Sequence, residues 1–159
     1  MERVRTVLAD RFAHRHLQPL AAAEACGIIG VVGGTAPAVD YILEGLSILQ
    51  NRGYDSAGMV TITEDKGLHV ARFASGVTTS DALDKLRAAA GGFKTDRHVG
   101  LGHTRWATHG AKTDHNAHPH LDATGRIAVV HNGVIENSEE LKGKCRGPGG
   151  VALSDSLSQ

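Results

Sequence analysis

A stripe of apolar residues between positions 39 and 49 constrains the fold of this chain more than any other feature of its sequence. Its members recur at intervals of three and four, the spacing of a helix that packs one face against a core: Val39, Ile42, Leu43, Leu46 and Leu49. Thr35 is expected to cap this helix, Pro37 to lie in its first turn, and Arg52-Gly53 to end it. Such a helix needs a second layer to cover.

Short apolar runs bounded by glycine and polar residues predict the strands of that second layer. The first run is closed by Gly33-Gly34, and a polar turn, Glu64-Asp65-Lys66-Gly67, joins the second run to the third. We expect strands at residues 28–32, 59–63, 68–73, 99–106 and 127–130.

Two further helices complete the predicted pattern. One is expected over residues 80–90, capped by Ser80 or Thr79 and stopped by Gly91-Gly92, and a short polar one over residues 136–144. Strand pairs that alternate with two or three helices indicate an α+β layered domain, and 159 residues suffice for one such domain.

Charge and composition exclude several classes of partner. The formal net charge is +0, so no electrostatic attraction to nucleic acid or to an anionic membrane is expected. No apolar run approaches the length that spans a bilayer. Cys26 and Cys145 are too few for a disulfide framework, which favours a reducing compartment and predicts a cytoplasmic protein.

The chain divides into three stretches. Residues 1–25 read as an N-terminal extension or pro-segment; they lack the apolar core of a secretory signal, whereas a transit peptide or a mis-assigned start codon both fit. Residues 26–144 form the body. Residues 145–159 are rich in glycine and proline and are expected to be a disordered tail.

Four segments hold small, polar and charged residues where a core strand or a plain turn needs none: residues 26–30, 51–58, 103–110 and 131–133. Each alone has an ordinary structural explanation, such as a buried cysteine, a connection, a polar hairpin or a type I′ turn. A metal site is a weaker alternative. His115, His118 and His120 lie close together in sequence, but no cysteine or carboxylate joins them at a recognised spacing.

Taken together and in this order, the segments RGYDSAG, HTRWATHG, NAHPH and HNG resemble the glutaminase domain of the class II, N-terminal-nucleophile amidotransferases. They are most similar to the glutamine–fructose-6-phosphate aminotransferase family, which forms glucosamine 6-phosphate, and the resemblance runs from Cys26 to about Lys144. It implies a partial glutaminase domain at residues 26–144 with a four-layer αββα sandwich, incomplete at its C-terminus. It also implies that neither a cofactor nor a metal is used.

The resemblance assigns the catalytic roles. Cys26 would be the nucleophile, and its α-amino group the base once Cys26 is the first residue. An α-amine has a pKa of about 7.7–8.0, close to the pH at which general base catalysis works best. The side chain of Asn132 and the backbone N–H of Gly133 would stabilise the oxyanion. No catalytic histidine is then required.

The resemblance also assigns residues that bind glutamine. Arg105 would hold the α-carboxylate of glutamine by a two-pronged contact, and Trp106 would belong to a lid that excludes water. The other residues implied in the glutamine site are Thr108, His109, His118 and Arg52.

Three departures from the family pattern keep alternatives open. With residues 1–25 in place, the nitrogen of Cys26 is an amide without basicity. The family carboxylate that holds the α-amino group of glutamine has only Asp155 as a counterpart. The sugar-phosphate isomerase domain, through which longer family members are expected to form homo-oligomers, is missing. The chain could therefore also be an amidotransferase with another acceptor, or a catalytically silent, truncated domain that acts only as a binding module.

Overall fold

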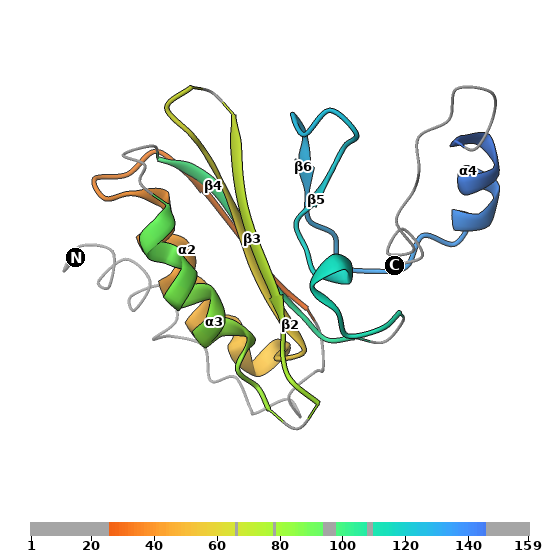
Figure 1. The fold of residues 1–159 in the computed structure, drawn as a ribbon, viewed down its shortest axis with the longest axis horizontal. Helices are drawn as coiled ribbons and strands as arrows, with labels where there is room; N and C mark the ends of the chain where they lie inside the picture. The colour runs from red at the N-terminus through yellow and green to blue at the C-terminus, as the bar shows by residue number, and fades with distance from the viewer. Residues whose placement is uncertain (1–25, 66, 78, 94–97, 108–109, 146–159) are drawn as a thin grey trace, which may run out of the picture.

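A four-stranded antiparallel sheet forms the centre of the fold (Figure 1). The computed structural model describes residues 26–65, 67–77, 79–93, 98–107 and 110–145. The strands lie in the order β1-β4-β2-β3. They are β1 (Gly27–Val32), β2 (Ser56–Ile62), β3 (Leu68–Ala74) and β4 (Val99–Arg105).

The sheet confirms four of the predicted strands, and the largest difference in extent is in β2. Strand β2 begins at Ser56 rather than at Met59, because Ser56 pairs with Ala74 of β3 on one side and with Arg105 of β4 on the other. The apolar run that predicted this strand starts only at Met59. The extension brings the RGYDSAG segment beside the HTRWATHG segment.

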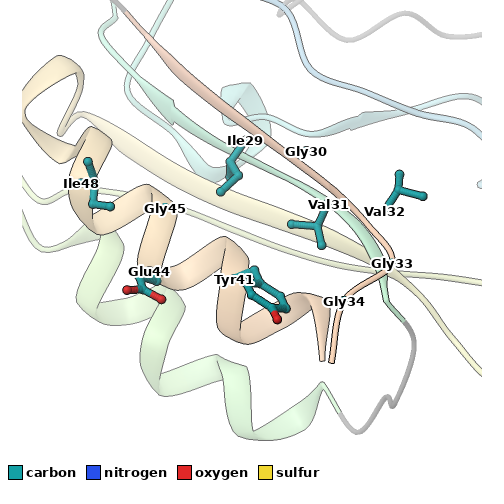
Figure 2. Close-up of a pocket in the computed structure, with 10 residues that line it drawn as sticks. All are labelled: Ile29, Gly30, Val31, Val32, Gly33, Gly34, Tyr41, Glu44, Gly45 and Ile48. Carbon is teal, nitrogen blue, oxygen red and sulfur yellow. The ribbon is translucent and has the colours of Figure 1, made fainter. Parts of the chain in front are cut away.

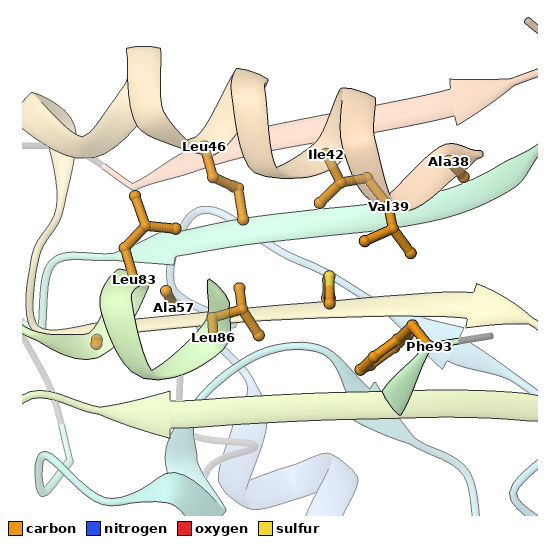
Figure 3. Close-up of a cluster of buried hydrophobic side chains, with 10 residues drawn as sticks. Ala38, Val39, Ile42, Leu46, Ala57, Leu83, Leu86 and Phe93 are labelled. Carbon is orange, nitrogen blue, oxygen red and sulfur yellow. The ribbon is translucent and has the colours of Figure 1, made fainter. Parts of the chain in front are cut away.

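Helices α2 (Ala38–Leu49) and α3 (Ala82–Ala89) pack against one face of the sheet. The predicted stripe of α2 is confirmed, since Val39, Ile42 and Leu46 are buried. They meet Leu83 and Leu86 of α3 in the core that Figure 3 shows. This core fixes the helices on the sheet, and of the RGYDSAG segment it includes Ala57.

Two glycines of β4 allow α2 to approach the sheet closely. A Cβ atom at Gly102 would lie 2.5 Å from the Cγ2 atom of Ile42, and one at Gly100 would lie 2.7 Å from its Cδ1 atom. Because side chains alternate along a strand, His103 and Arg105 point to the opposite face. Strand β4 thus carries the packing glycines on one face and polar residues on the other.

The predicted helix caps are wrong, while the predicted helix ends are confirmed. Pro37 itself occupies the cap position of α2, and the Thr35 hydroxyl lies 3.4 Å from that of Tyr41 instead. Asp81 occupies the cap position of α3, because its carboxylate accepts hydrogen bonds from Thr79 and from the Gly76 N–H and so orders the preceding loop. Short 3₁₀ turns then end both helices: η1 (Gln50–Arg52) and η2 (Ala90–Gly92).

The other face of the sheet is covered by the segment that follows β4. It contains the 3₁₀ turn η3 (Asp114–Asn116) and a two-stranded sheet of β5 (His120–Leu121) and β6 (Ala128–Val129). The predicted strand 127–130 is thus shorter than expected, and its partner β5 was not predicted. Asp122 closes the turn by accepting hydrogen bonds from the backbone N–H groups of Arg126 and Ile127, both at 2.8 Å.

Helix α4 (Ser138–Cys145) lies beyond the β5–β6 sheet in Figure 1, on the side away from α2 and α3. It confirms the short polar helix and extends it to Cys145, which the sequence placed in the tail. The α+β class is confirmed, whereas the four-layer sandwich stays a prediction. The stretches 1–25 and 146–159 lie outside the described residues. No helix in the described part of the chain is long and apolar enough to cross a membrane.

Candidate active site at the start of strand β1

Cys26 lies immediately before β1, beside the end of β4. The register that pairs Gly27 with Thr104 places Cys26 next to Arg105 and Trp106. The backbone N–H of Trp106 donates a hydrogen bond to the Cys26 sulfur at 3.3 Å. The thiol lies 3.7 Å from the Trp106 carbonyl oxygen, to which it can donate. Cys26 is partly exposed and is a free cysteine. The sulfur is thus held beside the end of β4 and stays open to solvent, as a nucleophile must be to meet a substrate.

Asn132 approaches Cys26 from a segment more than one hundred residues away in sequence. Its side-chain nitrogen donates to the Cys26 carbonyl oxygen at 2.8 Å. Gly133 follows with φ of 140°, a conformation that L side chains rarely adopt. The structure therefore brings the side-chain amide of Asn132 to the backbone of Cys26, while their roles as oxyanion donor and nucleophile stay predictions.

Arg105 is almost fully buried, with 1% of its surface exposed. Its Nη1 atom donates to the Ala111 carbonyl oxygen at 3.4 Å. Burial lowers the pKa of the Arg105 guanidinium, while the nearby Cys26 and Asp55 side chains act in the opposite direction. Arg105 thus places a positive charge close to the thiol, and its contact with glutamine stays a prediction.

Asp55 is a buried carboxylate that no role was predicted for. One of its oxygens accepts a hydrogen bond from the Ala107 N–H at 2.8 Å, and the other forms an ion pair with Lys112. Its own backbone N–H donates to the Arg105 carbonyl oxygen at 3.0 Å. Asp55 lies just before β2 and binds both Ala107 and Lys112. It therefore holds these two residues at the start of β2.

Three histidine rings pack against one another at the polar face of the sheet, the first pair tilted and the second edge-to-face. The ring centroids of His103 and His118 lie 4.4 Å apart, as do those of His118 and His120. Burial is the main cause that lowers their pKa values, to about 4 for His103, about 3 for His118 and about 4 for His120. The histidines are neutral at pH 7. Among the described residues, no group of three or more His, Cys, Asp or Glu side chains is placed to hold a metal ion.

The loop that carries His118 is held against the sheet at two points. Arg72 of β3 donates to the Pro119 carbonyl oxygen at 2.9 Å. Gly58 of β2 lies directly beneath the His118 carbonyl oxygen, so that a Cβ atom there would collide with it. Gly58, the second glycine of the RGYDSAG segment, is thus required for the loop of His118 to approach the sheet this closely.

The side chains of the remaining predicted residues make no hydrogen bond with Cys26 in the described part of the chain, and Trp106 meets its sulfur through backbone atoms. The rings of Trp106 and Tyr54 form an edge-to-face pair with centroids 5.0 Å apart, and Trp106 is partly exposed. Arg52 is exposed in η1. Thr108, His109 and Asp155 lie outside the described residues.

A separate groove of about 390 Å³ lies between β1 and α2, on the helix side of the sheet (Figure 2). Its lining includes Ile29, Val31, Tyr41, Glu44 and Ile48. Cys26 does not contribute to this lining. The groove and the cysteine site are therefore different features.

Sequence reasoning missed Asp55 and His103, although both lie within recognised segments. A signal for His103 exists in the alternation along β4, since Gly100 and Gly102 mark the helix side and His103 shares the other side with Arg105. No comparable signal marks Asp55, because its buried contacts come from residues about fifty positions away.

Comparison with known proteins supplies close sequence relatives. A protein of Mycolicibacterium smegmatis is 46% identical over 130 residues, which are 82% of this chain and 20% of the relative. One of Pyrococcus horikoshii is 47% identical over 130 residues, with the same shares, and one of Thermus thermophilus is 50% identical over 117 residues, 74% of this chain and 18% of the relative. All three are named glutamine–fructose-6-phosphate aminotransferase (isomerizing). No family model matches the chain.

Proposed function

We propose that this chain, a sequence relative of the glutamine–fructose-6-phosphate aminotransferases over about four fifths of its length, hydrolyses the side-chain amide of glutamine at Cys26. The chain spans about a fifth of the length of the curated relatives it matches. The first step proposed is therefore the hydrolysis of glutamine alone, which needs only the residues around Cys26.

The observation that carries the proposal is the meeting of three groups at Cys26. Its sulfur accepts a hydrogen bond from the Trp106 N–H at 3.3 Å, and its carbonyl oxygen accepts one from Asn132 at 2.8 Å. Cleavage of an amide requires a nucleophile, a base and donors to the oxyanion; Cys26 offers the first and the Asn132 amide the last, while the positive charge of Arg105 suits the α-carboxylate of glutamine.

In the proposed reaction the Cys26 sulfur attacks the side-chain carbonyl carbon of glutamine. The tetrahedral oxyanion is stabilised by the Asn132 amide and the Gly133 N–H, and ammonia leaves as the thioester forms. Water then attacks the thioester and releases glutamate. The α-amino group of Cys26 serves as base and acid, which requires that Cys26 be the first residue.

We extend the proposal to the fate of the ammonia. The relatives are named for fructose 6-phosphate as well as for glutamine. We infer that ammonia from this site converts fructose 6-phosphate to glucosamine 6-phosphate on a sugar-phosphate isomerase domain. That domain belongs to the four fifths of the relatives that this chain does not match. We also propose that the protein is cytoplasmic and that longer chains carrying the isomerase domain form homo-oligomers.

The test compares the 159-residue chain with one that begins at Cys26, using glutamate release from glutamine. We expect release only from the chain that begins at Cys26, because only there is the α-amine free. Cys26→Ala should abolish release, whereas Cys145→Ala is the matched control and should retain it. Equal release from the two chain lengths would contradict the role of the α-amine, and release from Cys26→Ala would contradict the proposed nucleophile.

A further inference from the structure

His103, Asn132 and Cys26 form a continuous series of hydrogen bonds. The Nε2 atom of His103 lies 2.8 Å from the side-chain oxygen of Asn132. The side-chain nitrogen of Asn132 in turn donates to the Cys26 carbonyl oxygen at 2.8 Å. Both polar atoms of the Asn132 amide are thus occupied, one by the candidate nucleophile residue and one by His103.

We propose that His103 is a positioning residue that fixes the amide of Asn132 with its nitrogen toward Cys26. The proposal deepens the amide hydrolysis proposed above and rests on it for its catalytic consequence. His103 itself touches neither the thiol nor the substrate in this role. It acts through Asn132.

The orientation of the amide depends on which atom of His103 carries the proton. The Cys26 carbonyl oxygen can only accept, so the Asn132 nitrogen must face it, and the Asn132 oxygen must then face a donor. His103 meets this need only with a proton on Nε2. With a lone pair there, Asn132 would turn over and set its oxygen against the Cys26 carbonyl oxygen.

The surroundings of His103 favour a single neutral form with that proton. The side chain is buried, and its Nδ1 atom has no hydrogen-bond partner among the described residues. A buried N–H without an acceptor costs about 1–3 kcal/mol, so the proton belongs on Nε2. Burial is the main cause that disfavours a second proton on His103, and the nearby Arg105 and His120 act in the same direction, whereas the hydrogen bonds to Asn132 and to the His131 backbone oppose them.

Two substitutions separate positioning from a purely structural role. In His103→Gln, the amide nitrogen of glutamine can reach the place of Nε2 and still donate to Asn132. In His103→Asn, the amide nitrogen reaches only the place of Nδ1, so the donor is lost although the new residue is also a polar amide. The two variants are therefore matched in chemistry and differ in reach.

The first measurement uses ¹⁵N NMR on the full chain and needs no activity. We expect the His103 ring to show the neutral form with its proton on Nε2. We also expect the Asn132 side-chain amide protons to be protected from exchange in the wild type and in His103→Gln. That protection should be lost in His103→Asn. A proton on Nδ1, or equal protection in both variants, would overturn the proposal.

The second measurement is glutamate release, in whichever form of the chain is active. A misplaced catalytic group costs about 10²-fold in rate, so kcat should fall by about 10²-fold in His103→Asn with little change in KM. His103→Gln should recover most of that loss. Equal kcat in both variants would overturn the catalytic part. A wild type without release in either form contradicts the proposed function, and the NMR result still decides the role of His103.

Discussion

The backbone nitrogen of Trp106 lies 3.3 Å from the sulfur of Cys26, although eighty positions separate the two residues in sequence. The contact uses the main chain of Trp106 and not its indole ring. It therefore depends on where the end of β4 lies, and that position is set by the residues that pack against it. Gly53 is one of them.

Gly53→Ala should move the end of β4 away from Cys26. A Cβ atom there would lie 2.6 Å from the Arg105 carbonyl carbon and 2.8 Å from the Trp106 nitrogen, both of them backbone atoms. Overpacking of this kind costs about 1–3 kcal/mol. We expect the free energy of unfolding in urea to fall by that amount, together with glutamate release.

Gly91→Ala is the matched control for this substitution, because a Cβ atom there meets nothing within 4 Å. It should leave both quantities close to their wild-type values. If Gly53→Ala were as stable and as active as Gly91→Ala, the close packing at Trp106 would not matter for the site.

Asp55→Ala should destabilise the fold and loosen the segment that follows β4. The substitution leaves the Ala107 N–H without its acceptor and Lys112 without its ion-pair partner. A buried donor without a partner costs about 1–3 kcal/mol. Asp55→Asn keeps an oxygen for Ala107 and should lose less. Chemical denaturation measures the free energy of unfolding of both variants. If Asp55→Ala were as stable as the wild type, the contacts of Asp55 with Ala107 and Lys112 would not stabilise the fold.

Arg105→Lys should raise the KM for glutamine in the active form of the chain. Lysine keeps the positive charge but loses the planar fork of donors, so we expect a loss of about 1–3 kcal/mol in binding. Because Arg105 is buried, the free energy of unfolding must be measured alongside. A normal KM in a stably folded variant would remove Arg105 from the glutamine site.

Acid should destabilise this fold before most carboxylates titrate. The pKa values of His103, His118 and His120 are lowered to about 4, about 3 and about 4 in the folded chain, whereas an unfolded histidine has a pKa of about 6.5. Below about pH 6.5 the unfolded state therefore binds more protons, and stability falls as the pH falls toward about 4.

The free energy of unfolding, measured between about pH 6 and pH 5, checks this expectation. Each such histidine contributes a slope of about 1.4 kcal/mol per pH unit. His118→Gln should remove one such contribution and leave the rest. A stability that does not change over this range would mean that the three rings are not held neutral by burial.

The fold was largely predictable from periodicity, because a long apolar stripe and short apolar runs encode which faces are buried. Strand β5 was not predicted, and β6 is shorter than the strand predicted over 127–130. Each has two residues and depends on the turn that Asp122 closes. Asp81 replaced the predicted caps because its carboxylate is engaged by the loop before α3.

Resemblance could name candidate residues for the site but not the contacts between them. Resemblance named Cys26, Asn132 and Arg105, and the structure brings these three close together. The resemblance could not reveal that Arg105 is buried or that His103 contacts Asn132, because both facts depend on the segment that folds back over the sheet. Long-range contacts of side chains with backbone groups leave no local pattern in a sequence.

Neighbouring positions of strand β4 tolerate different kinds of substitution, because they face opposite sides of the sheet. At Gly100 and Gly102 only the smallest residue fits beneath α2, so added volume is penalised whatever its polarity. At His103 and Arg105, which are also buried, polarity and hydrogen-bonding reach decide as well. Deleting one residue just before β4 would exchange the two sets, sending an imidazole and a guanidinium into the apolar layer. An insertion or deletion scan of this strand should therefore be lethal to folding at positions where many point substitutions impair only the chemistry.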